Sequence, residues 1–183
     1  MNLPNALSFL RIFAVPVFVW LVLNGHGKVA AWLFAMAGAT DAVDGLIAKR
    51  FDMVTELGGY LDPLADKLLL VSAFITLTYL GQMPLMLTLT VVTRDVIILV
   101  GAVVFQLMTG TLRMQPLWIS KVNTVVQILM VLLVLFSGVY GVLAWLVEPF
   151  VWLTTATTSI SGLVYVLAWT RKLVHVENPE LLP

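Results

Sequence analysis

Six long apolar stretches limit what this chain can fold into. A transmembrane helix needs about 20 predominantly apolar residues, and the stretches run from Leu7 to Asn24, Val29 to Ala48, Gly59 to Leu80, Pro84 to Met108, Asn123 to Leu146 and Phe150 to Thr170. Only 11% of the residues are charged, against about a quarter in a soluble domain. The sequence therefore predicts an all-α polytopic membrane protein with six transmembrane helices and a short N-terminal interfacial segment, Met1–Ala6.

Turn-forming residues separate the stretches. They are Asn24–Gly27, Gly81–Pro84, Thr109–Gly110 and Glu148–Pro149. The first stretch has no basic start and no small-residue cleavage site, so we expect it to be retained as a helix rather than removed as a signal peptide. No linker, low-complexity tract or repeat divides the chain, and residues 1–183 are predicted to form a single domain.

The basic residues predict how the helices are oriented. With six helices and a cytoplasmic N-terminus, Lys28 alone falls near the opposite side, and the residues near the cytoplasmic side are Arg11, Lys49, Arg50, Arg113, Lys121, Arg171 and Lys172. This bias follows the positive-inside rule. The 10 Lys and Arg balance the 10 Asp and Glu, and no basic run indicates a nucleic-acid partner. Cysteine is absent, which excludes thiolate chemistry.

Two pairs of aspartates interrupt the apolar stretches. Asp41 and Asp44 close the second stretch at a spacing of i, i+3, and Asp62 and Asp66 open the third at i, i+4. Each spacing places both carboxylates on one helical face. Because the connection between the two helices is short, we expect them to be antiparallel neighbours whose four carboxylates converge near the cytoplasmic surface.

Converging carboxylates in a medium of low dielectric need compensating charge. Hard divalent cations such as Mg²⁺ or Mn²⁺ prefer oxygen ligands, and four carboxylates match two ions about 3.5–4 Å apart. Any single aspartate could instead be an ordinary residue at a helix end, among hydrated lipid headgroups, with no role in metal binding. Gly45 and Gly58 flank the acids, and glycine there allows a nucleotide to approach the backbone closely, although small residues also serve ordinary helix packing in membranes.

The spaced residues resemble the signature of the CDP-alcohol phosphatidyltransferase family, D-x2-D-G-x2-A-R-x8-G-x3-D-x3-D. The matching positions are Asp41, Asp44, Gly45, Ala48, Gly58, Asp62 and Asp66, and Lys49 replaces the family's arginine, with Arg50 next to it. The segment from Pro4 to Arg11 also resembles the family's P-N-x-x-[ST]-x-x-R opening.

The resemblance implies a role for each residue. Asp41, Asp44 and Asp62 would bind two metal ions, and Asp66 would ligate one of them and take the proton from the attacking hydroxyl. The CDP moiety of CDP-diacylglycerol would be held by Asn5, Ser8, Gly45, Ala48, Lys49, Thr55 and Gly58. The resemblance also implies a homodimer among membrane lipids, in a bacterial cytoplasmic (inner) or mitochondrial inner membrane, with the site on the side of the N-terminus.

Two later segments bear on the acceptor alcohol. Thr93–Val96, with Arg94-Asp95, and Ser120–Thr124 resemble the R-D and S-K-x-N-T forms of the branch that makes cardiolipin from phosphatidylglycerol. The alternative branch makes phosphatidylglycerophosphate from glycerol 3-phosphate and more often reads R-E and G-K-x-K-T. Both acceptors are anionic, and Arg94, Arg113 and Lys121 are candidate residues to bind either one. Arg94 alternatively forms a structural pair with a motif aspartate or with Asp95, and Arg113 and Lys121 alternatively reflect topology alone.

Two other classes of protein account for the acids less well. A cation transporter also needs intramembrane carboxylates, but it would place them near the bilayer midplane on broken or repeated helices. A scaffold without catalysis would not need acids at these spacings.

Overall fold

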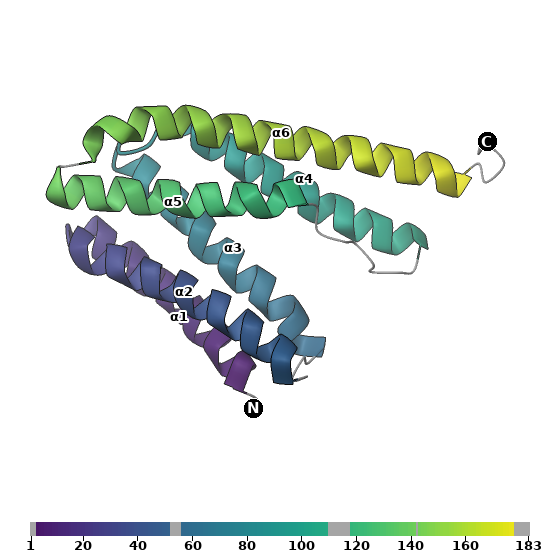
Figure 1. Ribbon diagram of the computed structural model, residues 1–183, viewed down its shortest axis with the longest axis horizontal. Helices are drawn as coiled ribbons and strands as arrows, with labels where there is room; N and C mark the ends of the chain where they lie inside the picture. The colour runs from purple at the N-terminus through teal and green to yellow at the C-terminus, as the bar shows by residue number, and fades with distance from the viewer. Residues whose placement is uncertain (1–2, 52–55, 110–117, 142, 178–183) are drawn as a thin grey trace.

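The computed structural model consists of helices along the part of the chain that it describes (Figure 1). They are α1 Leu3–Leu23, α2 Gly27–Phe51, α3 Glu56–Tyr79, α4 Leu85–Thr109, α5 Trp118–Tyr140 and α6 Ala144–Glu177. The structure describes residues 3–51, 56–109, 118–141 and 143–177, and only the helical backbone for 3–8, 41–51, 56–64, 66, 102, 105–109 and 171–177. The all-α prediction is confirmed for these residues.

Three helices end at a glycine in the left-handed region. Gly25, Gly81 and Gly141 follow α1, α3 and α5 with φ angles of 77°, 70° and 68°, a conformation that side chains disfavour. The first two glycines lie in predicted breaks. Gly141 lies outside the predicted breaks. Because α5 ends at Tyr140, the break predicted at Glu148–Pro149 is wrong.

Pro149 lies inside α6 because the helix begins at Ala144. A proline in this second turn removes one helical hydrogen bond, the one to the carbonyl of Trp145 close to the helix start, so the helix tolerates it. α6 also continues to Glu177, past the predicted end at Thr170. At the other terminus α1 begins at Leu3, so most of the expected interfacial segment is part of the first helix.

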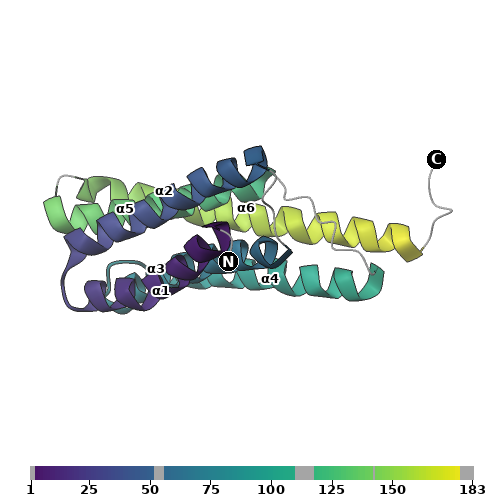
Figure 2. The same ribbon diagram turned by 90° about the horizontal axis from the view of Figure 1, so that it is seen from below.

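The helices form an elongated bundle in which neighbours in sequence are not always the main partners in space. α1 packs chiefly against α3, α5 against α6 and also α2, and α4 against α6. The connections from α1 to α2, α3 to α4 and α5 to α6 lie at one end of the bundle in both views (Figures 1 and 2). The end of α2 and the start of α3 lie away from that end.

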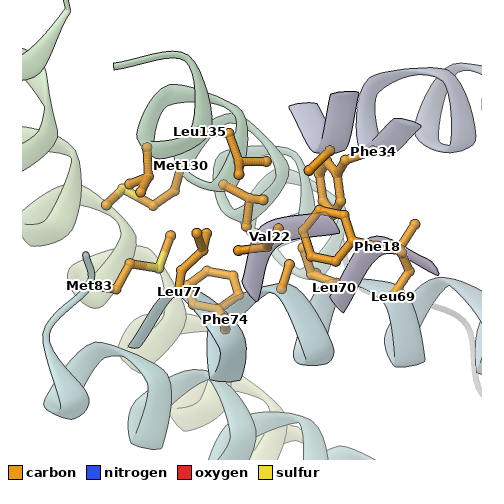
Figure 3. Packing of buried hydrophobic residues seen from close by; sticks show 14 of the residues in the cluster. Phe18, Val22, Phe34, Leu69, Leu70, Phe74, Leu77, Met83, Met130 and Leu135 are labelled. Atoms are coloured by element: carbon orange, nitrogen blue, oxygen red, sulfur yellow. The ribbon is translucent and has the colours of Figure 1, made fainter. Parts of the chain in front are cut away.

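An apolar core joins the helices between the connections and the aspartate motif. Phe18 of α1, Phe74 and Leu77 of α3 and Met130 of α5 are fully buried. The ring centroids of Phe18 and Phe34 are 5.7 Å apart, and Figure 3 shows the two rings side by side. This core fixes α1, α2, α3 and α5 relative to one another, which sets the positions from which the motif helices extend.

Elsewhere the distribution of polar and apolar residues is the reverse of that in a soluble protein. Between α5 and α6, Asn123, Gln127 and Thr158 have no exposed surface, and Thr158 Oγ1 donates a hydrogen bond to Asn123 Oδ1 at 2.9 Å. The tryptophans at positions 118, 145 and 152 are 81%, 73% and 70% exposed. Buried polar contacts and an apolar exterior indicate lipid as the surrounding medium.

Two helices are long and apolar enough to cross a membrane, Trp118–Tyr140 and the Ala144–Thr170 part of α6. In the other helices, charged residues or residues without described side chains shorten the apolar run. The prediction of six transmembrane helices is therefore supported in part, by two spans and by the matching number of helices in the described ranges.

Candidate active site

The aspartate motif lies on two helices that contact each other. Asp41 and Asp44 fall in α2, and Asp62 and Asp66 fall in α3, as the spacing predicts. The structure describes only the helical backbone at these four positions and at Asn5, Ser8, Gly45, Ala48, Lys49 and Gly58. Thr55 and Arg113 lie outside the described residues. The convergence of the four carboxylates and the nucleotide contacts therefore stay predictions.

A charged network lies beside the motif. Lys67 directly follows Asp66 in α3, and its Nζ lies 2.8 Å from both carboxylate oxygens of Asp95 in α4. Arg94 Nη1 lies 2.7 Å from Asp95 Oδ1. One carboxylate thus binds two cations and links α3 to α4.

Arg94 connects this network to two further helices. Its side chain is 4% exposed, and its Nη2 donates to Ser120 Oγ of α5 at 2.6 Å and to Ser161 Oγ of α6 at 2.7 Å. The guanidinium carbon lies 5.8 Å from the ring centroid of Tyr165. A buried guanidinium is tolerated when it is paired and hydrogen-bonded. Of the two interpretations of Arg94, the structure contains the pair with Asp95, and a contact with the acceptor stays a prediction.

Lys121 lies apart from the bonds of this network. It is exposed at the start of α5, and its Nζ lies 5.6 Å from the ring centroid of Trp118. The structure therefore brings Arg94 together with Asp95 and Lys67, but it does not bring Lys121 into the same set of hydrogen bonds.

Sequence reasoning named Asp95 as a possible partner of Arg94 but missed its pairing with Lys67. A lysine and an aspartate of opposite charge within neighbouring apolar stretches are a signal for pairing, since each is costly alone in lipid. Ser161 gave no such signal, because a serine inside an apolar helix commonly bonds to its own backbone. Only the approach of α6 to α4 reveals it as a partner of Arg94.

A cavity of about 100 Å³ opens next to the motif helices. Its polar lining is Arg11 of α1, Lys67 of α3 and Thr124 of α5, and the rest of its wall is apolar. Arg11 is 6% exposed. The cavity is well above the roughly 10–15 Å³ that one water molecule requires, so it can admit a small polar group.

The donor set of the motif fits hard cations. Four carboxylates on two helices in contact provide oxygen ligands only, and Mg²⁺ and Mn²⁺ prefer such ligands. If the four carboxylates converge, the site can hold a polyanionic substrate beside a carboxylate able to accept a proton. Those are the requirements of phosphoryl-type transfer to an alcohol.

A helical bundle with an apolar exterior and two aspartate pairs on contacting helices fits a membrane-bound transferase, and comparison with known proteins identifies the family. The family model of the CDP-alcohol phosphatidyltransferases matches residues 1–169. The chain belongs to this family, which confirms the resemblance drawn from the spaced aspartates.

The relatives include proteins named cardiolipin synthase and proteins named phosphatidylglycerophosphate synthase. A cardiolipin synthase (CMP-forming) from Rattus norvegicus is 34% identical over 96% of this chain and 63% of its own length. One from Streptomyces coelicolor is 32% identical over 97% of this chain and 86% of its own length. A probable phosphatidylglycerophosphate synthase from Mycobacterium tuberculosis is 40% identical over 69% of this chain and 62% of its own length. The chain thus spans less than two thirds of the rat relative.

Replacing Arg94 with methionine should destabilise the protein. The change leaves Asp95 with one cation and removes the bonds to Ser120 and Ser161, and breaking a buried ion pair costs about 3–5 kcal/mol. For a chain of this size we expect the Tm to fall by roughly 5–15 °C. Thermal unfolding in detergent measures this, with Lys28→Met, an exposed cation at the far end of the bundle, as the control. Equal Tm values for the two variants would show that the network does not stabilise the fold.

Proposed function

We propose that this protein transfers a phosphatidyl group from CDP-diacylglycerol to phosphatidylglycerol, giving cardiolipin and CMP, with two divalent metal ions. The observation that carries the choice of acceptor is the hydrogen bond from Arg94 Nη2 to Ser120 Oγ at 2.6 Å. It joins the two segments that resemble the cardiolipin-forming branch, although they lie on different helices. Two segments with one shared structural role are better support for a branch than either segment alone.

The relatives named cardiolipin synthase support the same proposal, although a relative named for glycerol 3-phosphate also matches across 90% of this chain. Those named cardiolipin synthase match over 96% and 97% of this chain, so the likeness includes α5 and α6. The runner-up is a phosphatidylglycerophosphate synthase, which would use glycerol 3-phosphate as acceptor. The M. tuberculosis relative favours this second candidate, because it is more similar to the chain, at 40% identity, than the two cardiolipin synthases. Its match covers 69% of this chain.

The proposed reaction assigns one step to each group of residues. The backbone and side chains at Gly45, Ala48, Lys49, Thr55 and Gly58, with Asn5 and Ser8, hold the CDP moiety. The four aspartates hold two divalent ions, which supply neutralising charge at the diphosphate. Asp66 accepts the proton of the acceptor hydroxyl. The oxygen so activated forms a bond to the phosphorus that carries diacylglycerol, and the bond from that phosphorus to CMP breaks.

The proposal places the reaction at a membrane surface. All six helices enter the bilayer, the N-terminus is cytoplasmic, and the site faces that side. The support is the distribution of basic residues, with Lys28 alone expected on the opposite side, and the apolar exterior of the bundle. A homodimer follows from the family resemblance only.

An acceptor assay tests the choice between the two branches. Purified protein is given CDP-diacylglycerol with Mg²⁺ or Mn²⁺ and both acceptors, phosphatidylglycerol and glycerol 3-phosphate, in one reaction. We expect cardiolipin and CMP in equal amounts. Formation of phosphatidylglycerophosphate without cardiolipin would show that the protein is a phosphatidylglycerophosphate synthase. The absence of CMP release with either acceptor would favour a transporter or a scaffold.

A further inference from the structure

We propose that a cavity at the connection end of the bundle binds the phosphate of an anionic phospholipid, in the leaflet opposite the aspartate motif. The cavity measures about 490 Å³ and lies between the α1–α2 turn, the α3–α4 turn and the end of α5. Its polar lining is His26, Lys28 and Gln82. The inference goes beyond the proposed function, because the residues that line this cavity belong neither to the motif nor to the Arg94 network.

The first argument is the distance between the cavity and the motif. Lys28 lies in the first turn of α2, and Asp44 follows it by 16 residues in the same helix. At about 1.5 Å per residue, this separation corresponds to about 24 Å along the helix, most of the roughly 30 Å thickness of the hydrocarbon core of a bilayer. The start of α2 lies with the other connections, and its end lies away from them (Figures 1 and 2). With α2 crossing the membrane, the cavity and the motif lie at opposite leaflets.

The second argument is the depth of the cavity in the membrane. Large aromatic side chains lie at the same end of the bundle, near the end of α1, the end of α5 and the start of α6. Trp20, Tyr140 and Trp145 are 59%, 57% and 73% exposed. Exposed tryptophan and tyrosine are typical of the level of the lipid headgroups. The cavity therefore opens at the level where the phosphates of the surrounding lipids lie.

The third argument is the hydrogen-bonding capacity of the polar wall. Lys28 has no acidic partner among the described residues, and its Nζ lies 5.7 Å from the ring centroid of Tyr140. An aromatic contact stabilises a cation without neutralising it, so the charge of Lys28 is available to an anion. The ring of His26 stacks on Trp20, with centroids 5.7 Å apart. Ammonium, imidazole and the amide of Gln82 can all donate hydrogen bonds to phosphate.

The fourth argument is that hydrogen bonds fix both turns of the cavity wall. In the α1–α2 turn, Gly25 has a positive φ, and the N–H of His26 donates to a carbonyl in the last turn of α1 at 2.8 Å. In the α3–α4 turn, Gly81 has a positive φ, and the N–H of Gln82 donates to a carbonyl in the last turn of α3 at 2.9 Å. Each is the outer bond of a Schellman motif. A wall that is already ordered lowers the entropic cost of binding.

The rest of the wall favours a phospholipid over a free anion. Its larger side chains are apolar and belong to Val22 of α1 and to Leu135 and Val139 of α5. A free phosphate would leave this apolar surface in contact with water, whereas a phospholipid brings apolar chains next to its phosphate. The volume is also within the range of about 300–1,000 Å³ that is typical of ligand pockets. Basic pockets between transmembrane helices are known to bind lipid headgroups.

A lipid titration followed by NMR at His26 tests this site. The chain contains two histidines, His26 and His175, so histidine-labelled protein in a neutral detergent gives one ring signal at the cavity and one reference signal. Dioleoylphosphatidic acid should shift the His26 signal to saturation and leave the His175 signal in place. Lys28→Met should raise the Kd about tenfold or more, because a charged hydrogen bond is lost. Lys28→Arg keeps the charge and is the matched control, with a Kd close to that of the wild type.

Gly138→Leu gives an independent test without removing a charge. Gly138 of α5 lines the cavity, and a Cβ there would meet no atom within 4 Å, so a leucine side chain can occupy part of the cavity while the helix persists. The shift of the His26 signal by phosphatidic acid should be lost, and the Tm without added lipid should not fall. Gly138→Ala leaves most of the volume open and should still bind the lipid.

Two further ligands separate the sources of the phosphate. Dioleoylphosphatidylcholine has no net charge and inorganic phosphate has no acyl chains, and we expect neither to shift the His26 signal where phosphatidic acid saturates it. An equal shift with phosphatidylcholine would overturn the recognition of charge, and an equal shift with inorganic phosphate would overturn the lipid as ligand. An unchanged Kd in both Lys28→Met and Gly138→Leu would overturn the site itself. None of these measurements involves CMP release, so their outcome is independent of the proposed function.

Discussion

Asp66→Asn should lower the turnover number by about 10²–10⁴-fold, the contribution of a general base. Asparagine has nearly the same shape as aspartate, but it cannot accept the proton of the acceptor hydroxyl. Rates of CMP release at saturating concentrations of both substrates measure the change. Glu148→Gln, at an exposed position near the start of α6, is the matched control and should retain the wild-type rate.

The same variant must still fold and bind CDP-diacylglycerol for the result to concern the proton transfer. Thermal unfolding and equilibrium binding of CDP-diacylglycerol provide these checks. A residual rate above about a tenth of the wild-type rate would mean that another group takes the proton.

Removal of divalent metal should abolish turnover. The four aspartates provide oxygen ligands and leave the charge of the diphosphate unbalanced without cations. Excess chelator should stop CMP release, and added Mg²⁺ or Mn²⁺ should restore it. If two ions are required, the rate should rise with free metal more steeply than a one-site binding curve.

Full activity in excess chelator would contradict the metal requirement altogether, and a one-site dependence would reduce the number of ions to one. Unfolding curves recorded with and without chelator separate loss of catalysis from loss of structure. Calcium, which tolerates more ligands and longer bonds than Mg²⁺, is a useful comparison ion, and we expect it to support less activity.

The local features of this protein could be predicted from its sequence. Apolar length defined the helices, and Gly25 and Gly81 ended α1 and α3 where turn residues predicted. The spacing of the aspartates placed Asp41 and Asp44 on one helix and Asp62 and Asp66 on the next, and it identified the family. These features depend on residues close together in the chain, so the sequence contains them directly.

The boundary between α5 and α6 was predicted wrongly for a physical reason. Proline is a strong helix breaker on average, but near a helix start it removes little hydrogen bonding, so Pro149 was mistaken for the break. The glycine at position 141 was the better signal, because a backbone with positive φ ends a helix whatever follows.

The contacts between helices were decided by the tertiary structure. The sequence placed α3 next to α2, whereas α3 packs chiefly against α1, because complementary side-chain surfaces rather than short connections select the main partner. The pairing of Lys67 with Asp95, and of Arg94 with Ser120 and Ser161, joins residues up to 67 positions apart. Sequence alone determined which residues carry charge in an apolar chain. Which of those charges meet depends on how the helices pack, since a buried charge is stable only where a partner on another helix reaches it.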